Sequence, residues 1–271
     1  MKITYWGTGA YEAIPAPFCA CSICENARNQ KGKEIRTRHC TTIDDLIQLD
    51  YSPDNLLQTL WYGLNVRDIR HLLITHGHYD HFDFWRLDVR RVPCASSDLP
   101  RLTVVGNPYV IEKIEHMEAF HQLKIDTIET KYYESIAIDA STVVTPLPAN
   151  HAQEIGGGNL YHIARNNRQF LFAHDSGPLY EDVFRWLSGK QMDAVSLDCT
   201  GVLCDGGPTH MNIASCGNTV RRLLEDGSLK SGSIQIYSHF SHCGGATHAQ
   251  LEIESKPHEW TPAFDGMSIQ I

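Results

Sequence analysis

Short apolar runs that end in histidine or aspartate recur along this chain and predict buried strands with polar ends. Leu72–Ile74 leads into a stretch of seven residues, Thr75–His81, and Gln169–Ala173 leads into His174-Asp175. Such apolar runs, bounded by polar residues, are typical of buried strands. Loops on a rigid sheet often carry binding and catalytic groups. The pattern is repeated at three further runs: Thr142–Leu147 before His151, Ala194–Leu197 before Asp198, and Ile234–Tyr237 before His239. One edge of a sheet system is therefore predicted to be the active face.

Other elements surround this framework. A helix is predicted whose amphipathic body is Leu56–Leu64. Ser52-Pro53-Asp54 marks its start, because proline is favoured at the first helical position. A second helix is predicted over Tyr109–Ala119. Gly156-Gly157-Gly158 lacks the Lys-Ser/Thr of a phosphate-binding loop and is predicted to be a turn. Further strands are predicted at Ile3–Trp6, Thr41–Asp50, Leu102–Val105, Ile125–Thr130 and Ser135–Ile138. No linker or repeat interrupts the pattern, so residues 1–271 are expected to form one domain.

Charge and composition narrow the class of partner. The net charge of −9 over 271 residues argues against the basic surface that grips nucleic acid. The chain has no run of 18 apolar residues and no signal-peptide pattern after Met1, so neither a membrane span nor export is expected. Nine cysteines, an odd number, suit a reducing cytoplasm. The expected partner is a small molecule, and a homodimer is left open.

The stretch from His76 to His81 reads H-x-H-x-D-H and predicts a metal site. It gathers three imidazoles and a carboxylate within six residues. This ligand mixture suits Zn, Mn or Fe, and its clustering suits two ions. The alternative is a solvated polar loop in a chain that contains 15 histidines. The isolated pair His39-Cys40 is expected to be packed rather than ligating.

A second cluster, Cys19, Cys21 and Cys24, reads C-x-C-x-x-C. Three thiols this close can reach one tetrahedral ion but need a fourth ligand from elsewhere. Buried reduced thiols or a redox C-x-x-C are the alternatives, although no thioredoxin-like pattern follows. A structural zinc is expected, and such an ion contributes on the order of 10 kcal/mol to folding at neutral pH.

The order of these motifs, with single ligands at later strand ends, resembles the metallo-β-lactamase superfamily of binuclear hydrolases. The resemblance implies an αββα sandwich of the α+β class, with two facing mixed sheets flanked by helices and two divalent ions at one edge. It assigns one ion to His76, His78 and His151, the second to Asp80, His81 and His239, and the bridging position to Asp175. Asp50 would support these ligands through a hydrogen bond.

A narrower resemblance links the chain to the cyclic phosphodiesterases of the carbon–phosphorus lyase pathway, which open phosphoribosyl 1,2-cyclic phosphate. It is carried by the cysteine cluster, by Ser238–His242 and by Phe264–Met267. It implies that His242 completes the structural zinc site and that His210 donates a proton. His174 stands where serine is usual, which leaves the substrate open. His174, His162 and His248 are not expected to bind metal.

The reaction implied by this resemblance is hydrolysis of a small, cyclic ribose phosphodiester in phosphonate metabolism. Two ions about 3.5–4 Å apart share a water and lower its pKa from 15.7 toward 7, so that a metal-bound hydroxide attacks phosphorus. Asp80, Asp175 and His210 would be the catalytic residues. The alternatives are a cofactor-biosynthesis relative with the same cysteine site, a tRNA 3′-end endonuclease, and a non-catalytic zinc-stabilised binding protein. The endonuclease would need a basic arm, which this chain lacks.

Overall fold

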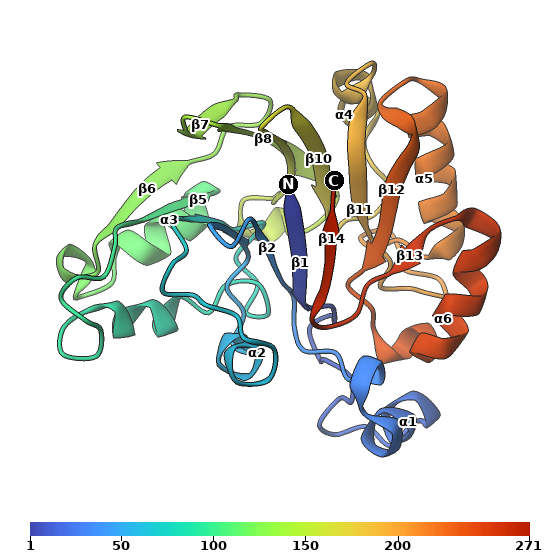
Figure 1. Ribbon diagram of the computed structural model, residues 1–271, viewed down its shortest axis with the longest axis horizontal. Helices are drawn as coiled ribbons and strands as arrows, with labels where there is room; N and C mark the ends of the chain where they lie inside the picture. The colour runs from blue at the N-terminus through green and yellow to red at the C-terminus, as the bar shows by residue number, and fades with distance from the viewer.

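Two seven-stranded mixed sheets face each other in this computed structural model, which describes residues 1–271, and helices cover their outer faces (Figure 1). The first sheet has the order β14-β1-β2-β3-β4-β5-β6. Its strands are β1 (Lys2–Gly7), β2 (Cys40–Ile43), β3 (Ile47–Leu49), β4 (His71–Leu73), β5 (Leu102–Gly106), β6 (Ile125–Glu129) and β14 (Met267–Gln270).

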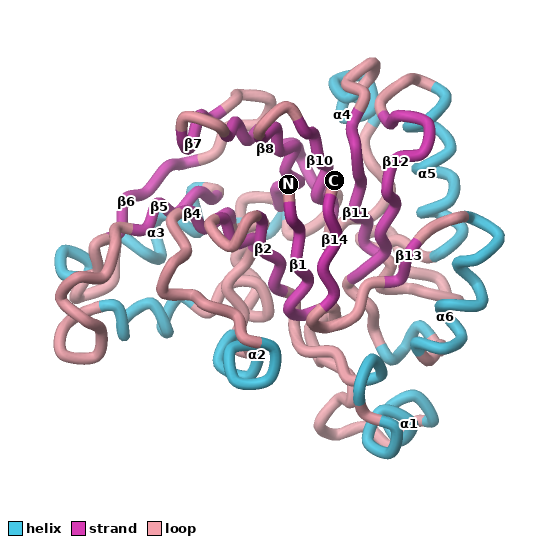
Figure 2. The backbone as a smooth tube through the Cα atoms, viewed as in Figure 1, coloured by secondary structure: helices cyan, strands magenta, loops and turns pink.

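The second sheet has the order β13-β12-β11-β10-β9-β8-β7. Its strands are β7 (Ile136–Asp139), β8 (Thr142–Ala149), β9 (Gly158–Arg165), β10 (Arg168–Ala173), β11 (Met192–Asp198), β12 (Leu229–Ser238) and β13 (Thr261–Pro262). The expected αββα sandwich is confirmed by this arrangement, whose strands and helices are separated by colour in Figure 2.

The core forms three layers because each sheet is apolar on both faces. Side chains of both sheets, among them Tyr5, Leu49, Phe170 and Phe172, fill the space between them. Outside the first sheet lie α2 (Asn55–Tyr62) and α3 (Pro108–Glu115), and outside the second lie α4 (Glu181–Leu187), α5 (Ile213–Glu225) and α6 (His248–Ser255). The remaining helix, α1 (Ser22–Gln30), belongs to the cysteine-containing N-terminal segment. None of these helices has the length and apolarity that a bilayer span requires.

Parallel pairing brings the active strand ends to one edge, as the apolar pattern predicted. Strands β3, β4 and β5 run parallel to one another, as do β10, β11 and β12. Their carboxyl ends therefore point the same way within each sheet. The segments that follow these strands carry Asp50, His76, Asp175 and His239, and Asp198 is the last residue of β11.

Some local predictions were wrong. The helix α2 begins at Asn55 with Asp54 as its N-cap, so Pro53 lies in the preceding turn and not at the first helical position. The helix α3 ends at Glu115 instead of Ala119. Gly156 and Gly157 form the expected turn with left-handed backbone, but Gly158 already belongs to β9, a strand that the apolar pattern did not reveal.

Candidate metal centre

All seven ligands expected at the paired-metal site meet at the carboxyl ends of the strands. The ligand atoms of one group lie within 4.8 Å of one another, and the same holds for a second group. The first group is His76, His78, His151 and Asp175, and the second is Asp80, His81, His239 and Asp175. Asp175 is common to both.

The shared carboxylate lies between the two groups. Oδ2 of Asp175 is 3.2 Å from Nε2 of His76 and 2.9 Å from Nε2 of His81. Its other oxygen, Oδ1, is buried without a hydrogen-bond partner. This is the geometry of a residue that can contact two ions, the role that the family resemblance implied for Asp175.

Three of the ligand imidazoles are held by oxygens that contact their outward-facing nitrogens. Nδ1 of His81 lies 2.7 Å from Asp50 Oδ2, and Nδ1 of His76 lies 3.0 Å from Thr75 Oγ1. Thr200 Oγ1 is 2.8 Å from Nδ1 of His239. In His76, His81 and His239 the Nδ1 atom is turned outward, so Nε2 faces the centre. Hydrogen bonds of this kind orient metal ligands.

The backbone around the centre is adapted to these positions. Asp50, Asp175 and His239 each adopt left-handed backbone, with φ of 64°, 52° and 62°. Gly77 separates His76 from His78, and a Cβ there would lie 2.4 Å from the ring of Tyr109. A side chain at position 77 would therefore push the loop and its two histidines away from the centre.

The electrostatics of the centre favour a cation. Burial alone would raise the pKa of Asp80, but His81 lowers it to about 2, so this carboxylate is ionised at neutral pH. Burial also disfavours the charged form of His81, yet Asp80, Asp50 and Asp175 outweigh it and raise its pKa well above the usual value. Burial lowers the pKa of His151 to about 4, which leaves that imidazole neutral with a free lone pair.

These residues fit a pair of divalent ions. Imidazole and carboxylate are the donors that Zn, Mn and Fe accept. Besides Asp175 Oδ1, the Nδ1 atom of His151 is buried without a partner. Converging lone pairs and buried carboxylates would be costly to bury without a cation.

His210, expected to donate a proton, lies at the edge of the centre. Its Nδ1 is 3.1 Å from Asp198 Oδ2 and 3.2 Å from Asp175 Oδ1. Burial opposes the protonated imidazole, but Asp198 and Asp175 outweigh it and raise the pKa of His210 to about 9. The ring is therefore held as a cation with a proton to give.

Asp198 is a site residue to which the sequence interpretation gave no role. It is fully buried and accepts hydrogen bonds from the backbone N–H groups of Thr200 and Met211. The ligand atoms of Asp175, Asp198, His210 and His239 also lie within 4.8 Å of one another. The only sequence signal for Asp198 is its position at the end of β11.

Glu154 is a further neighbour of the centre that the sequence interpretation did not name, and the histidines outside the ligand set can now be located relative to the centre. Glu154 Oε1 lies 2.9 Å from Nε2 of His78. His39 and His174 are buried behind the ligands, and His174 Nε2 lies 2.7 Å from Ser196 Oγ in the sandwich core. His162 contacts Gln169 and Trp186, away from the centre.

His248 also lies away from the centre, where its Nδ1 is 2.9 Å from Nη2 of Arg36. Neither His162 nor His248 belongs to any of the clusters that could hold an ion.

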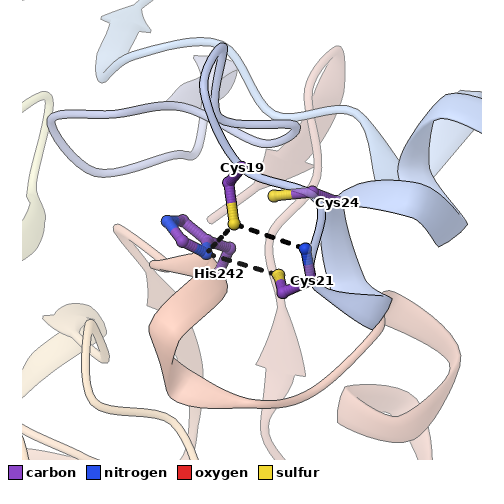
Figure 3. Close-up of side chains that lie close together, drawn as sticks. All are labelled: Cys19, Cys21, Cys24 and His242. Carbon is purple, nitrogen blue, oxygen red and sulfur yellow. Dashed lines mark hydrogen bonds between the residues drawn. The ribbon is translucent and has the colours of Figure 1, made fainter.

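The cysteine cluster meets His242 as expected (Figure 3). Nδ1 of His242 lies 3.6 Å from the Cys19 sulfur and 3.5 Å from the Cys21 sulfur. The Cys24 backbone N–H lowers the pKa of the Cys21 thiol to about 6, which favours the thiolate that binds zinc. Cys24 is buried beside them, so three sulfurs and one nitrogen offer a tetrahedral set.

A cavity of about 360 Å³ opens onto the paired-metal site. Half of its twelve lining residues belong to the centre itself: His78, Asp80, His151, Asp175, His210 and His239. The others are Ala10, Tyr11, Glu12, Tyr79, Thr200 and Ser241. The cavity suits a small molecule, and it has no lysine or arginine in its wall.

A family model described as the β-lactamase superfamily domain matches residues 47–228, which include most of the ligands. The chain belongs to this superfamily. This metallo-β-lactamase superfamily member, with its convergent metal ligands, is a metal-dependent hydrolase. Comparison with curated proteins gives no match.

Solved structures share the fold over the whole chain. A diphosphatase from the PhnP family superposes with a TM-score of 0.77 at 20% identity, covering 100% of this chain and 97% of that one. Zinc-bound PqqB from Methylobacterium extorquens gives 0.74 at 18% identity, with full coverage of both chains. Human tRNase Z, short form, gives 0.63 at 16% identity, covering 100% and 99%. These identities establish the fold alone.

Proposed function

We propose that this superfamily member is a binuclear phosphodiesterase that hydrolyses a small phosphodiester of the cyclic ribose type. The observation that carries the proposal is the position of Asp175 Oδ2, which lies within reach of ligands from both groups. A carboxylate placed in this way suits two ions near 4 Å apart. Two ions at that spacing can stabilise both the attacking oxygen and the leaving oxygen of a displacement at phosphorus. Zn and Mn are the expected ions, with Fe as a third option.

Bound divalent ions would polarise a phosphoryl oxygen and make a water nucleophilic at neutral pH. The protein contributes orientation through Asp50 and Thr200, which fix His81 and His239. His210 holds a proton, and its Nε2 has no protein partner while Nδ1 faces two carboxylates. Donation from Nε2 to the leaving alkoxide is general-acid catalysis, worth about 10²- to 10⁴-fold.

Other activities of this fold are less well supported by the chain. The PhnP-family relative is a diphosphatase, so cleavage of a diphosphate is the second candidate. The cavity offers no lysine or arginine for the additional charge of a diphosphate, which favours a single phosphodiester group. The acidic chain also argues against tRNA, the substrate class that the name of tRNase Z indicates for that relative.

The test is turnover by protein reconstituted with Zn or Mn. We expect hydrolysis of bis(p-nitrophenyl) phosphate and of ribose 1,2-cyclic phosphate, and little cleavage of ADP-ribose or pre-tRNA. Asp175→Asn is the loss-of-activity control. Absence of phosphodiester hydrolysis in protein that holds two active-site ions would reject the proposal, and preference for ADP-ribose would favour a diphosphatase. Elemental analysis should find three ions per chain, one of them zinc bound by Cys19, Cys21, Cys24 and His242.

A further inference from the structure

Glu12 is a carboxylate in the cavity wall that belongs to no predicted motif. Ser241 Oγ donates a hydrogen bond to its Oε1, and Nε2 of His242 lies 3.6 Å from the same oxygen. No protein group bonds Oε2. The side chain keeps 27% of its surface exposed and lines the cavity above the metal centre. Glu12 is thus fixed through one oxygen, and the other is free to accept a hydrogen bond.

The segment that carries Glu12 is attached to the chain directly after His239. The Ala10 backbone N–H donates to the Phe240 carbonyl at 3.1 Å, and Gly9 forms a bridge with Phe240. A few residues later, the cysteine cluster meets His242. This wall is therefore positioned by the same short segment that supplies a metal ligand, so Glu12 has a defined place relative to the centre.

The charge of the cavity restricts what can occupy it. Outside the residues of the metal centre, Glu12 is the one charged side chain among the twelve that line it. Phosphate groups are recognised by arginine, lysine or converging backbone N–H groups. A phosphate beyond the metal centre would meet the Glu12 carboxylate and no lysine or arginine. Tyr11 and Tyr79 border the same cavity and are 62% and 53% exposed, so their aromatic side chains are accessible for contact with the C–H groups of a sugar.

We propose that Glu12 determines the substrate class by accepting a hydrogen bond from a hydroxyl or ammonium group on the part of the substrate that does not react. This inference rests on the proposed phosphodiesterase function. The substrate is then a phosphodiester of an unphosphorylated sugar, polyol or amino alcohol. A second phosphate outside the metal centre, such as a 5-phosphate on ribose, is disfavoured.

The experiment compares kcat/KM for four probes with metal-loaded enzyme. They are ribose 1,2-cyclic phosphate, its 5-phosphorylated form, glycerophosphoethanolamine, and bis(p-nitrophenyl) phosphate, which has no hydroxyl or ammonium donor. We expect the wild type to prefer the unphosphorylated ribose compound, or glycerophosphoethanolamine, over the 5-phosphate by at least about tenfold, the scale of a hydrogen bond to a charged group. Preference for the ammonium compound over the sugar identifies ammonium as the donor, and the reverse identifies hydroxyl.

Variants at position 12 test the residue itself. Glu12→Gln should lower the ratio of kcat/KM for the preferred probe to that for bis(p-nitrophenyl) phosphate about tenfold, mainly through KM. Glu12→Lys should reverse the preference toward the 5-phosphate. Glu225→Gln, an exposed carboxylate on α5, is the matched control and should change neither ratio. Zinc content and melting temperature of each variant show whether the cysteine site is intact, because Glu12 lies near His242.

The outcomes separate the two proposals. Hydrolysis of bis(p-nitrophenyl) phosphate together with a wild-type preference for the 5-phosphate would overturn the role of Glu12 and leave the phosphodiesterase standing. So would unchanged ratios in both Glu12 variants. Absence of turnover with every probe would overturn the phosphodiesterase proposal and this inference with it.

Discussion

Asp50 Oδ2 and His81 Nδ1 lie 2.7 Å apart, and neither side chain has any exposed surface. The carboxylate also accepts hydrogen bonds from the backbone and the hydroxyl of Thr75, the residue before His76. One buried group therefore orients the beginning of the H-x-H-x-D-H segment and its last histidine.

Asp50→Asn should weaken metal binding about 10- to 100-fold, because the amide keeps the shape but loses the charge that orients His81. Zinc titration against a chromophoric chelator measures the change. Asp45→Asn, on an exposed neighbouring turn, is the control and should bind as the wild type does. Equal affinities for the two variants would show that Asp50 has no part in organising the centre.

His210→Ala should retain both active-site ions and lose about 10²- to 10⁴-fold in kcat, since a general acid is removed but no ligand is. Metal analysis and steady-state kinetics on the same preparation measure the two effects. His116→Ala, at an exposed position after α3, is the matched control. Loss of one ion together with turnover would instead make His210 a ligand, in agreement with its proximity to Asp175, Asp198 and His239.

Cys21→Ser should remove about one zinc per chain and lower the melting temperature, because three remaining donors bind zinc less tightly than four. Elemental analysis of protein purified without added metal gives the count. Cys94→Ser changes an exposed free thiol outside the cluster and should leave the zinc in place. The same zinc content in both variants would be incompatible with a site at Cys19, Cys21, Cys24 and His242.

His162 should make the fold sensitive to acid. Burial lowers its pKa to about 4, against an ordinary value of 6.5. The unfolded chain therefore takes up a proton first, and stability falls as the pH drops from about 6.5 toward 4. Between pH 7.5 and pH 5 this single group should reduce the free energy of unfolding by about 2 kcal/mol.

Urea denaturation of the wild type and of His162→Gln at these two pH values measures the effect of His162. The variant should lose less stability on acidification than the wild type, whatever its stability at pH 7.5. His121→Gln, at an exposed position, should follow the wild type. Identical pH dependence in wild type and His162→Gln would show that His162 titrates normally in the fold.

The strand-end pattern predicted much of the site because strand direction and sheet pairing place such residues together. His76, His78, Asp80 and His81 were recognised from spacing that a short loop preserves in three dimensions. The αββα sandwich, by contrast, was expected from a family resemblance, since periodicity alone does not determine which strands pair.

The residues that were missed have partners far away in the sequence. Glu12 is bonded by Ser241, 229 positions later, and no local pattern marks either residue. Asp198 gains its role only because the loop with His210 and Met211 folds back onto it. The strand β9 was missed since its first residue closes a glycine run that reads as a turn.

The left-handed backbone at Asp50, Asp175 and His239 affects which residues evolution would favour at these positions. Residues with a Cβ are disfavoured in that conformation, by roughly 1–2 kcal/mol, whereas glycine adopts it freely. Selection for an easily folded scaffold alone would therefore let all three drift toward glycine. In a descendant of this chain that no longer needs the activity, substitutions should remove the metal ligands and their support first at these three positions. The two sheets should persist.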